Sequence, residues 1–365
     1  GIVSGGITAD SLNIGQIGGR RNLIINGAMQ VAQRGTSFTG LTNGSSGYTL
    51  DRWEWRESST TSSVWTVNQD TNTPNGFAYS IKATATTGAS TASGNLNRFR
   101  QSIEAQNLQG LAHGTSDAKQ LTISFYVKSN KTGTANVTLY APDSDDLYAA
   151  NYTIDTADTW EYKTITYSAN TSGSITNDNG VGFYVDFIYA AGDTYTTGTG
   201  GSWANYASPN YAPGQTLEVG TATNDYFQIT GVQLEVGSVA SSYEHRSYGE
   251  ELALCQRYYT RYSASATNTA FGPAMIGTYN TTTALNIVHQ HVVPMRSGAT
   301  FGYSALSDFD IEPWDLEPTA MAIFSHSGPT HISLIITDPV AHSIGDCGVI
   351  ACDTNGGYYE FDAEL

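Results

Sequence analysis

Short runs in which apolar and polar residues alternate recur along most of the chain. In LTISFYVKS, residues 121–129, the apolar positions are the odd-numbered ones from Leu121 to Val127. The segments 77–83 and 181–189 alternate in the same way. A period of two is typical of a strand with one buried face, and turns rich in Gly, Asn and Ser between such runs favour a sandwich or a barrel. The pattern therefore predicts an all-β protein.

The segment YFQITGVQLEV, residues 226–236, changes phase in its middle. Phe227 and Ile229 share one phase, whereas Val232 and Leu234 share the other, with Gly231 between the two pairs. One extra residue in a strand produces this shift, so we expect a β-bulge at Gly231.

Three residues of the segment DRWEW, residues 51–55, share one strand phase. They are Asp51, Trp53 and Trp55. Two tryptophans in one strand phase bury much apolar area, and we expect both in the core rather than on a ligand platform.

One helical pattern interrupts the strand pattern, at SYGEELALCQRY, residues 247–258. Ser247 and Glu250 have the spacing of a capping box, which predicts where the helix begins. Larger side chains then follow at spacings of 4, 3, 4 and 3, namely at Tyr248, Leu252, Cys255, Tyr259 and Tyr262. This seam predicts a helix over residues 247–262 that packs either between chains or on its own sandwich. Two heptads do not decide between these alternatives.

These patterns divide the chain of 365 residues, which is long enough for two cores. Residues 1–21 are rich in Gly and have no core pattern, so we expect an arm or shaft connection. Residues 22–246 are expected to form the sandwich, and residues 247–262 the connecting helix. Residues 263–365 show further alternating segments and are expected to form a smaller C-terminal β domain.

The charge composition narrows the classes of partner. The formal net charge is −17 and only 13% of the residues are charged. A surface this acidic repels phosphate groups, so no nucleic-acid partner is expected. No apolar run approaches the roughly 20 residues that span a bilayer, and GIVSGGITAD at the start lacks the features of a signal peptide. The three cysteines, Cys255, Cys347 and Cys352, are an odd and sparse set that does not make a disulfide framework, and all three are expected to be buried thiols.

Five phrases occur in a characteristic order: NLIINGAMQVAQRGTSF (22–38), YTLDRWEW (48–55), a long phrase over residues 229–259, VVPMR (292–296) and YYEFDAEL (358–365). In this the chain resembles bacteriophage tail-fibre and related virion proteins. The resemblance implies a virion protein made in the host cytoplasm, usually a homotrimer, at the host-binding end of a fibre. It also implies contacts with other virion tail proteins and a jelly-roll domain similar to carbohydrate-binding modules.

Those modules commonly hold a structural Ca²⁺ through acidic residues at the first and last strands of the jelly roll. Here Gln30, Thr230 and Gly231 stand at the corresponding places. Calcium prefers anionic oxygen ligands, so we expect neither this calcium site nor any other cofactor.

A long loop over residues 192–214 is the candidate binding site. It is rich in Tyr, Trp, Asn, Ser and Gly, a composition that combines rigid aromatic surfaces with adaptable hydrogen-bonding groups. A host-surface glycan or an outer-membrane receptor is the expected ligand. The candidate residues are Trp203, Asn205, Tyr206, Asn210 and Tyr211. The favoured alternative for Trp203 is that it is buried and anchors the loop.

Two other clusters are weaker candidates. Asp308, Asp310 and Glu312 alternate and could chelate a cation, although a solvated face is the favoured interpretation. His289 and His291 share a strand face, and in a trimer with this face at the axis six imidazoles could bind a transition metal. A packed histidine pair is favoured.

No catalytic motif is present in the sequence, so we expect no enzyme activity. The alternatives are a tail protein that degrades capsule or other polysaccharide, and a structural virion protein without receptor contact.

Overall fold

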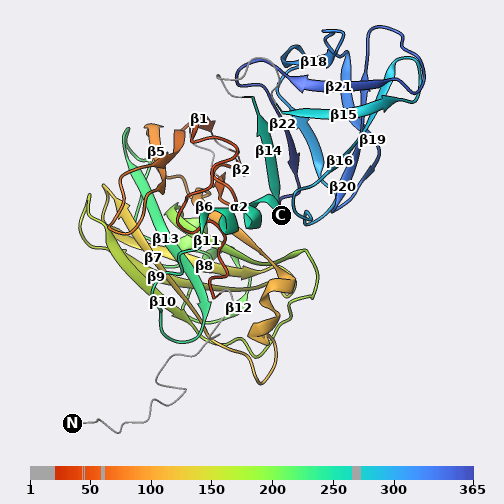
Figure 1. Cartoon of the computed structure of the whole chain (residues 1–365). Helices are drawn as coiled ribbons and strands as arrows, with labels where there is room; N and C mark the ends of the chain where they lie inside the picture. Colours follow the sequence, from red (N-terminus) through yellow and green to blue (C-terminus); the bar gives the residue numbers. More distant parts are fainter. Residues whose placement is uncertain (1–20, 43, 45, 59–61, 265–272) are drawn as a thin grey trace, which may run out of the picture. The chain divides into compact units, whose positions relative to one another are not determined.

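The computed structural model describes residues 21–42, 44, 46–58, 62–264 and 273–365 (Figure 1). The chain forms two compact units, residues 1–251 together with Leu365, and residues 252–364. Apart from Arg21, the predicted arm of residues 1–21 lies outside the described residues. Both units consist of antiparallel sheets, so the all-β prediction is confirmed.

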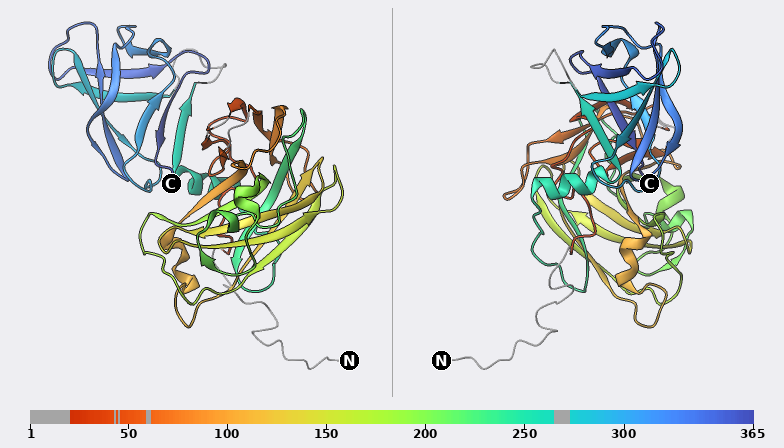
Figure 2. Two further views of the ribbon diagram at one scale, coloured as in Figure 1. Left: turned by 180° about the vertical axis from the view of Figure 1, so that it is seen from behind. Right: turned by 45° about the vertical axis from the view of Figure 1, so that its right-hand side comes forward.

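The first unit is the predicted jelly-roll sandwich. One sheet contains, in spatial order, β1 (Ser37–Thr42), β4 (Val64–Asp70), β5 (Ser80–Thr87), β13 (Tyr226–Val236), β7 (Leu121–Ser129) and β10 (Glu161–Tyr167). The other contains β12 (Ala204–Asn205), β9 (Asp146–Ile154), β8 (Gly133–Ala141), β11 (Val181–Ala191), β6 (Leu96–Glu104), β3 (Glu54–Ser58) and β2 (Ser46–Tyr48). The two further views in Figure 2 show the same two layers of strands. Short helices lie in the connections: η2 (Ala105–Leu111), α1 (Asp193–Thr196) and η3 (Ser208–Asn210).

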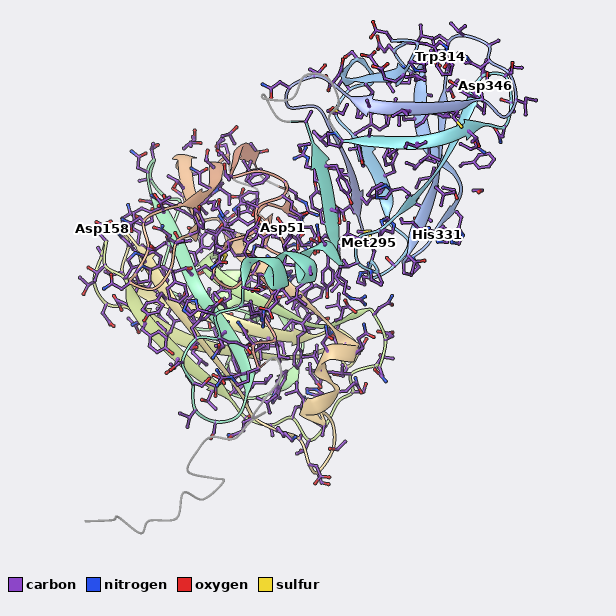
Figure 3. The ribbon with its side chains drawn as sticks, in the orientation of Figure 1. Asp51, Asp158, Met295, Trp314, His331 and Asp346 are labelled. Atoms are coloured by element: carbon purple, nitrogen blue, oxygen red, sulfur yellow. The ribbon has the colours of Figure 1, made fainter. Side chains whose placement is uncertain are left out.

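The core between these sheets contains the side chains that the alternation predicted. The apolar side chains of β7 are at most 3% exposed, and Trp53 and Trp55 are 0% and 1% exposed. Asp51, which shares their phase and is labelled in Figure 3, is also buried, and its carboxylate accepts hydrogen bonds from Gln33. Both tryptophans are therefore core residues, as predicted.

The predicted bulge in β13 is also present. The register of β13 against β7 shifts between Thr230 and Gln233, and Gly231 has a φ of +62°. A Cβ atom at Gly231 would lie 2.6 Å from the ring of Phe77. Both the left-handed backbone and the close ring therefore require glycine here.

The connecting helix begins as predicted but is shorter than predicted. Helix α2 spans Tyr248–Gln256, and Ser247 and Glu250 form the capping box, with the Ser247 backbone N–H donating to the Glu250 carboxylate at 2.9 Å. A strand, β14 (Tyr259–Ser263), follows almost at once. The seam predicted to continue through Tyr259 and Tyr262 is wrong, because both residues lie on this strand.

The second unit contains two sheets around its own core. The smaller has the order β14, β22 (Tyr358–Asp362), β17 (Thr300–Tyr303). The larger has the order β18 (Phe309–Glu312), β21 (Cys347–Cys352), β15 (Ala274–Tyr279), β16 (Ala284–Gln290), β20 (His331–Thr337), β19 (Ala320–Ser327), and η4 (Leu306–Asp308) precedes β18. At one end of this unit Trp314, labelled in Figure 3, packs on His342 with 4.0 Å between ring centroids.

Two further sequence expectations concern the membrane and the cysteines. Among the described residues, none of the helices has the length and apolar character that crossing a bilayer requires. All three cysteines are free thiols; Cys255 and Cys352 are buried as expected, but Cys347 is exposed, so its predicted burial is wrong.

Candidate functional site

The loop of residues 192–214 lies on the outer face of the seven-stranded sheet, the face turned away from the core. The backbone N–H of Gly201 donates to Ala149 of β9 at 2.8 Å, and the Thr138 hydroxyl of β8 donates to the Tyr211 carbonyl at 2.7 Å. Strand β12 within the loop pairs with β9. Tyr211 and Ala212 also join an apolar cluster with residues of this sheet. Hydrogen bonds and packing together hold the loop in one position.

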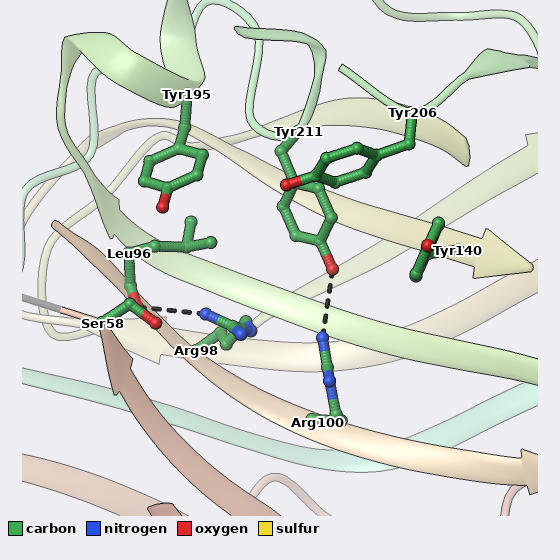
Figure 4. A pocket seen from close by; sticks show the side chains of 8 residues that line it. All are labelled: Ser58, Leu96, Arg98, Arg100, Tyr140, Tyr195, Tyr206 and Tyr211. Atoms are coloured by element: carbon green, nitrogen blue, oxygen red, sulfur yellow. Dashed lines mark hydrogen bonds between the residues drawn. The ribbon is translucent and has the colours of Figure 1, made fainter. Parts of the chain in front are cut away.

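A pocket of about 330 Å³ lies between this loop and the sheet (Figure 4). Its floor is formed by Arg98 and Arg100, which project from β6. Four tyrosines line it, two of which were not predicted. The lining residues are Ser58, Leu96, Arg98, Arg100, Tyr140, Tyr195, Tyr206 and Tyr211.

A buried ion-pair network fixes the floor of the pocket. The fully buried carboxylate of Asp186 accepts two hydrogen bonds from Arg100, each 2.7 Å, and one from the Tyr211 hydroxyl at 2.6 Å. The Arg98 Nε atom lies 3.0 Å from Asp186 Oδ2. Burial alone would raise the pKa of Asp186, but Arg100 and Arg98 outweigh that effect and hold its pKa below the ordinary value. Asp186 is therefore ionised at neutral pH.

Aromatic rings form one wall of the pocket. The Arg100 guanidinium lies 3.9 Å from the ring centroid of Tyr184, and Tyr184 stacks on Tyr140 at 6.0 Å. The Tyr206 ring packs against Tyr140 at 5.4 Å. Burial and a hydrogen bond to Asp145 raise the pKa of Tyr140 to about 12, so its hydroxyl remains protonated. Ring faces beside protonated hydroxyls and a guanidinium can bind a polar ring that has both apolar and hydrogen-bonding edges.

The structure brings two of the five candidate loop residues together in the pocket. Tyr206 is 40% exposed, whereas Tyr211 is 4% exposed and tied to Asp186. Asn205 is exposed on β12, and the Asn210 side chain accepts a hydrogen bond from the Thr199 backbone within the loop. Ligand binding by these residues stays a prediction.

Trp203 contributes to loop anchoring. Its ring stacks on Phe183 at 5.9 Å and packs edge-on against His113, and its Nε1–H donates to the Ser168 carbonyl at 2.7 Å. These contacts agree with the anchoring role in the alternative interpretation, but Trp203 is half-buried and not buried as expected.

Sequence reasoning missed the charged floor. Arg98 and Arg100 flank the buried Phe99 in β6, so the alternation already placed both arginines on the outer face. Asp186 occupies the same outward phase in β11, between the buried Val185 and Phe187. Two sequence features could have predicted the charged floor: two arginines on one strand face, and a carboxylate in a strongly apolar strand.

The acidic cluster of the second unit does not form a chelating row. The Asp308 carboxylate accepts hydrogen bonds from the Ser304 hydroxyl at 2.5 Å and from the Ala305 backbone. Burial and the neighbouring Asp353 raise the pKa of Asp310 to about 6. Within the described part of the chain, no three His, Cys, Asp or Glu side chains gather in a way that could hold a metal ion.

The histidine pair is packed inside the second unit. The His289 ring stacks on Phe361 of β22 at 4.5 Å and lies 5.8 Å from the His291 ring. Burial and the nearby His291 lower the pKa of His289 to about 4, so its ring is neutral at pH 7. The strand face that carries His289 is covered by β14 and β22 of the same unit, with Tyr262 5.5 Å from His289. This is the packed pair that the sequence favoured; the alternative, six imidazoles meeting at a trimer axis, would need this face to be open.

Comparisons with known proteins give weak similarities. No protein-family model matches the chain, and no curated protein matches it. Among solved structures, the enzymatically active domain of tailspike protein 4 from bacteriophage CBA120 matches 59% of this chain and 21% of its own, with 12% identity and a TM-score of 0.31. The CBM22-1 xylan-binding domain from Paenibacillus barcinonensis matches 61% of this chain and 100% of its own, with 12% identity and a TM-score of 0.30. A family 11 carbohydrate-binding module from Clostridium thermocellum matches 57% and 96%, with 11% identity and a TM-score of 0.27. Identities and TM-scores of this size assign neither a family nor a function.

Proposed function

We propose that the first unit binds a saccharide in the pocket between residues 192–214 and the seven-stranded sheet. The observation that carries the proposal is the combination of tyrosine rings and buried, hydrogen-bonded polar groups in one pocket of about 330 Å³. The apolar faces of a sugar ring stack on aromatic side chains, and its hydroxyl groups need donors and acceptors at the ring edge. The pocket offers both.

In this proposal the chain is a tail-fibre protein of a phage virion and the saccharide belongs to the host surface. The order of the sequence phrases described above supports this setting. The proposed role is attachment without catalysis. In support of this, no carboxylate is among the described residues that line the pocket. The adjacent Asp186 is held ionised by two arginines, so it is unsuited to act as a general acid.

We also propose that the second unit associates with copies of itself, as expected for a homotrimeric fibre. Its larger sheet exposes aliphatic side chains on the face away from its core, with Ile276 70% and Val288 61% exposed. Strands β15, β16 and β20 contain no Asp, Glu, Lys or Arg. Each copy carries a net charge of −17, so two copies repel each other electrostatically. This repulsion is weakest when the copies meet through a face without charged residues.

Tyr206→Ala tests the binding proposal. Tyr206 is 40% exposed, and among the described residues its hydroxyl has one hydrogen-bond partner, the Ser208 hydroxyl at 3.4 Å, so the substitution removes a pocket wall at little cost to stability. We expect binding on a host-glycan array and adsorption to host cells to fall about tenfold or more, since stacking of one ring contributes roughly 1–3 kcal/mol in comparable polar-ring sites. The melting temperature should stay nearly constant.

Tyr162→Ala is the matched control for this test. Tyr162 is 49% exposed and packs on Tyr126, but it lies on β10 of the other sheet. Equal losses of binding in the two variants, or unchanged binding in Tyr206→Ala, would contradict the proposed site.

A further inference from the structure

The floor of the pocket holds more positive than negative charge. Arg98 and Arg100 are each 6% exposed and both line the pocket, and among the described residues Asp186 is the one carboxylate that forms an ion pair with them. A charge that is removed from water needs a partner, because desolvation otherwise opposes its burial. One carboxylate shared between two guanidinium groups leaves one positive charge in excess at this floor.

The strand register shows that Arg98 carries this excess. Arg100 lies opposite Asp186 on β11 and opposite Glu54 on β3. Arg98 lies opposite Ile188 on β11 and opposite Arg56 on β3. Both neighbouring carboxylates therefore flank Arg100, while Arg98 has an apolar residue on one side and a like charge on the other.

The hydrogen bonds of Arg98 lead to the same conclusion. A guanidinium has five N–H donors. Among the described residues, Arg98 donates one hydrogen bond, from Nη1 to the Leu96 carbonyl at 3.2 Å, and its Nε–H is buried and forms none, although Nε lies close to Asp186. Arg100, in contrast, directs both Nε and Nη2 to Asp186 and Nη2 also to Tyr211. Because the buried Nε lies 3.0 Å from Asp186, the donors that Arg98 retains for a ligand are those on its terminal Nη atoms.

We propose that the saccharide bound in this pocket is acidic, with a carboxylate, as in a uronic acid, paired with Arg98 and with its ring against Tyr206. This inference rests on the proposed function of the pocket. A planar guanidinium matches a carboxylate in geometry, and a charged hydrogen bond of this kind is about twice as strong as a neutral one. A neutral sugar would leave Arg98 with only the carboxylate of Asp186, which it shares with Arg100.

The other charges near the pocket do not cancel this preference. Arg56 forms an ion pair with Glu54 at 3.4 Å. Asp145 does not line the pocket, and its carboxylate accepts a hydrogen bond from the Tyr140 hydroxyl. The net charge of −17 is spread over the whole chain. Because charges further away than a Debye length of about 8 Å are screened at physiological salt, the local arginine governs the bound anion.

Calorimetric titration of the full chain tests the inference. The probes are oligogalacturonate, hyaluronan and alginate tetrasaccharides and sialyllactose, each paired with its carboxyl-reduced, neutral form. At least one acidic probe should bind tenfold or more tightly than its reduced form. Arg98→Gln should abolish that preference. Lys119→Gln, which makes the same charge change at an exposed residue, should retain it.

Each outcome separates the inference from the proposed function. Equal or tighter binding of the reduced forms, or a preference that persists in Arg98→Gln, would overturn the acidic ligand while the saccharide site stands. Absence of binding to every probe and to an array of neutral glycans would overturn both. If Arg98→Gln does not fold, the wild-type protein decides: its preference for the acidic form must shrink between 50 and 500 mM NaCl, and a salt-independent preference would refute the pairing.

Discussion

Replacing Asp186 with Asn should destabilise the first unit more than any other single loss of charge at the pocket. The carboxylate is fully buried and receives hydrogen bonds from Arg100 and Tyr211 in addition to the contact with Arg98. An amide offers one acceptor oxygen in place of two and directs an NH₂ group at an existing donor. Removing one partner of a buried ion pair costs about 3–5 kcal/mol, which is a large share of a typical stability of roughly 5–15 kcal/mol.

Urea unfolding followed by tryptophan fluorescence measures this loss. Every tryptophan except Trp314 belongs to the first unit, so the signal reports mainly on that unit. Asp145→Asn is the control, because it makes the same chemical change at an exposed carboxylate that accepts the Tyr140 hydroxyl. Asp145 has a φ of +56°, which Asn tolerates, and its replacement should change the stability by no more than about 0.5 kcal/mol.

Tyr211→Phe should give an intermediate result. It removes one hydroxyl that donates to Asp186 and accepts from Arg100 at 3.1 Å, and hydrogen bonds to charged groups contribute roughly 1.5–3 kcal/mol. Because the pKa of Asp186 is held below its ordinary value, the advantage of the wild type over Asp186→Asn should persist at pH 5 and decline only as acid protonates the carboxylate. A loss below about 1 kcal/mol for Asp186→Asn at pH 7 would refute the importance of the network.

Three further predictions concern the bulge, the acidic pair and self-association. Gly231→Ala should destabilise the first unit by about 1–3 kcal/mol in urea unfolding, because φ is +62° and the new Cβ meets an aromatic ring. The control Gly249→Ala in α2, where the added Cβ has open space, should stabilise the protein by up to about 1 kcal/mol. A change of the same sign in both variants would contradict the reasoning. The pKa of Asp310 is raised by burial and by nearby carboxylates to about 6, so its contribution to stability is present below about pH 4 and is lost as the pH rises through 6. Asp310→Asn should therefore stabilise relative to wild type at pH 7 and have little effect at pH 4, and equal effects at both values in urea unfolding would exclude the raised pKa. Ile276→Asp should lower the mass measured by light scattering after size-exclusion chromatography. The control Val239→Asp, at a side chain 58% exposed in the first unit, should leave this mass unchanged. An identical mass for the two variants would show that Ile276 does not lie in the interface.

The strands and the bulge could be predicted because their signals are local. Alternation over a few residues places Leu121 or Phe187 in the core whatever the neighbouring strand is, and the phase shift at Gly231 is contained in one strand. The start of α2 was equally local, since Ser247 and Glu250 satisfy each other's groups within one turn.

The end of α2 could not be predicted from spacing alone. Tyr259 and Tyr262 fit a helical period, but they also belong to the run YYTRYS, which is rich in residues that favour strands. In the structure this segment pairs with β22, with Tyr262 opposite Tyr359. Pairing with a strand about a hundred residues away decided the outcome, and no local pattern contains that information.

The pocket was only partly predictable for the same reason. The aromatic composition of residues 192–214 marked the loop, but the loop sequence does not say which strand it covers. Arg98, Asp186 and Tyr211 meet because β6 pairs with β11 and the loop folds back over both strands. Ion pairs between residues of distant segments can be identified only when the pairing of the strands and its register are known.

The loop separates the residues that hold it from those that could contact a ligand. Trp203 and Tyr211 are fixed by packing and by hydrogen bonds to the sandwich, whereas Tyr206 and Asn205 are exposed between them. Two anchors on either side of an exposed segment fix its backbone, so the backbone does not depend on the side chains of Tyr206 and Asn205. Under the proposed function, substitutions at Tyr206 or Asn205 would change which saccharide fits while the anchors keep the loop in place, and the arginines beneath would favour an acidic ligand.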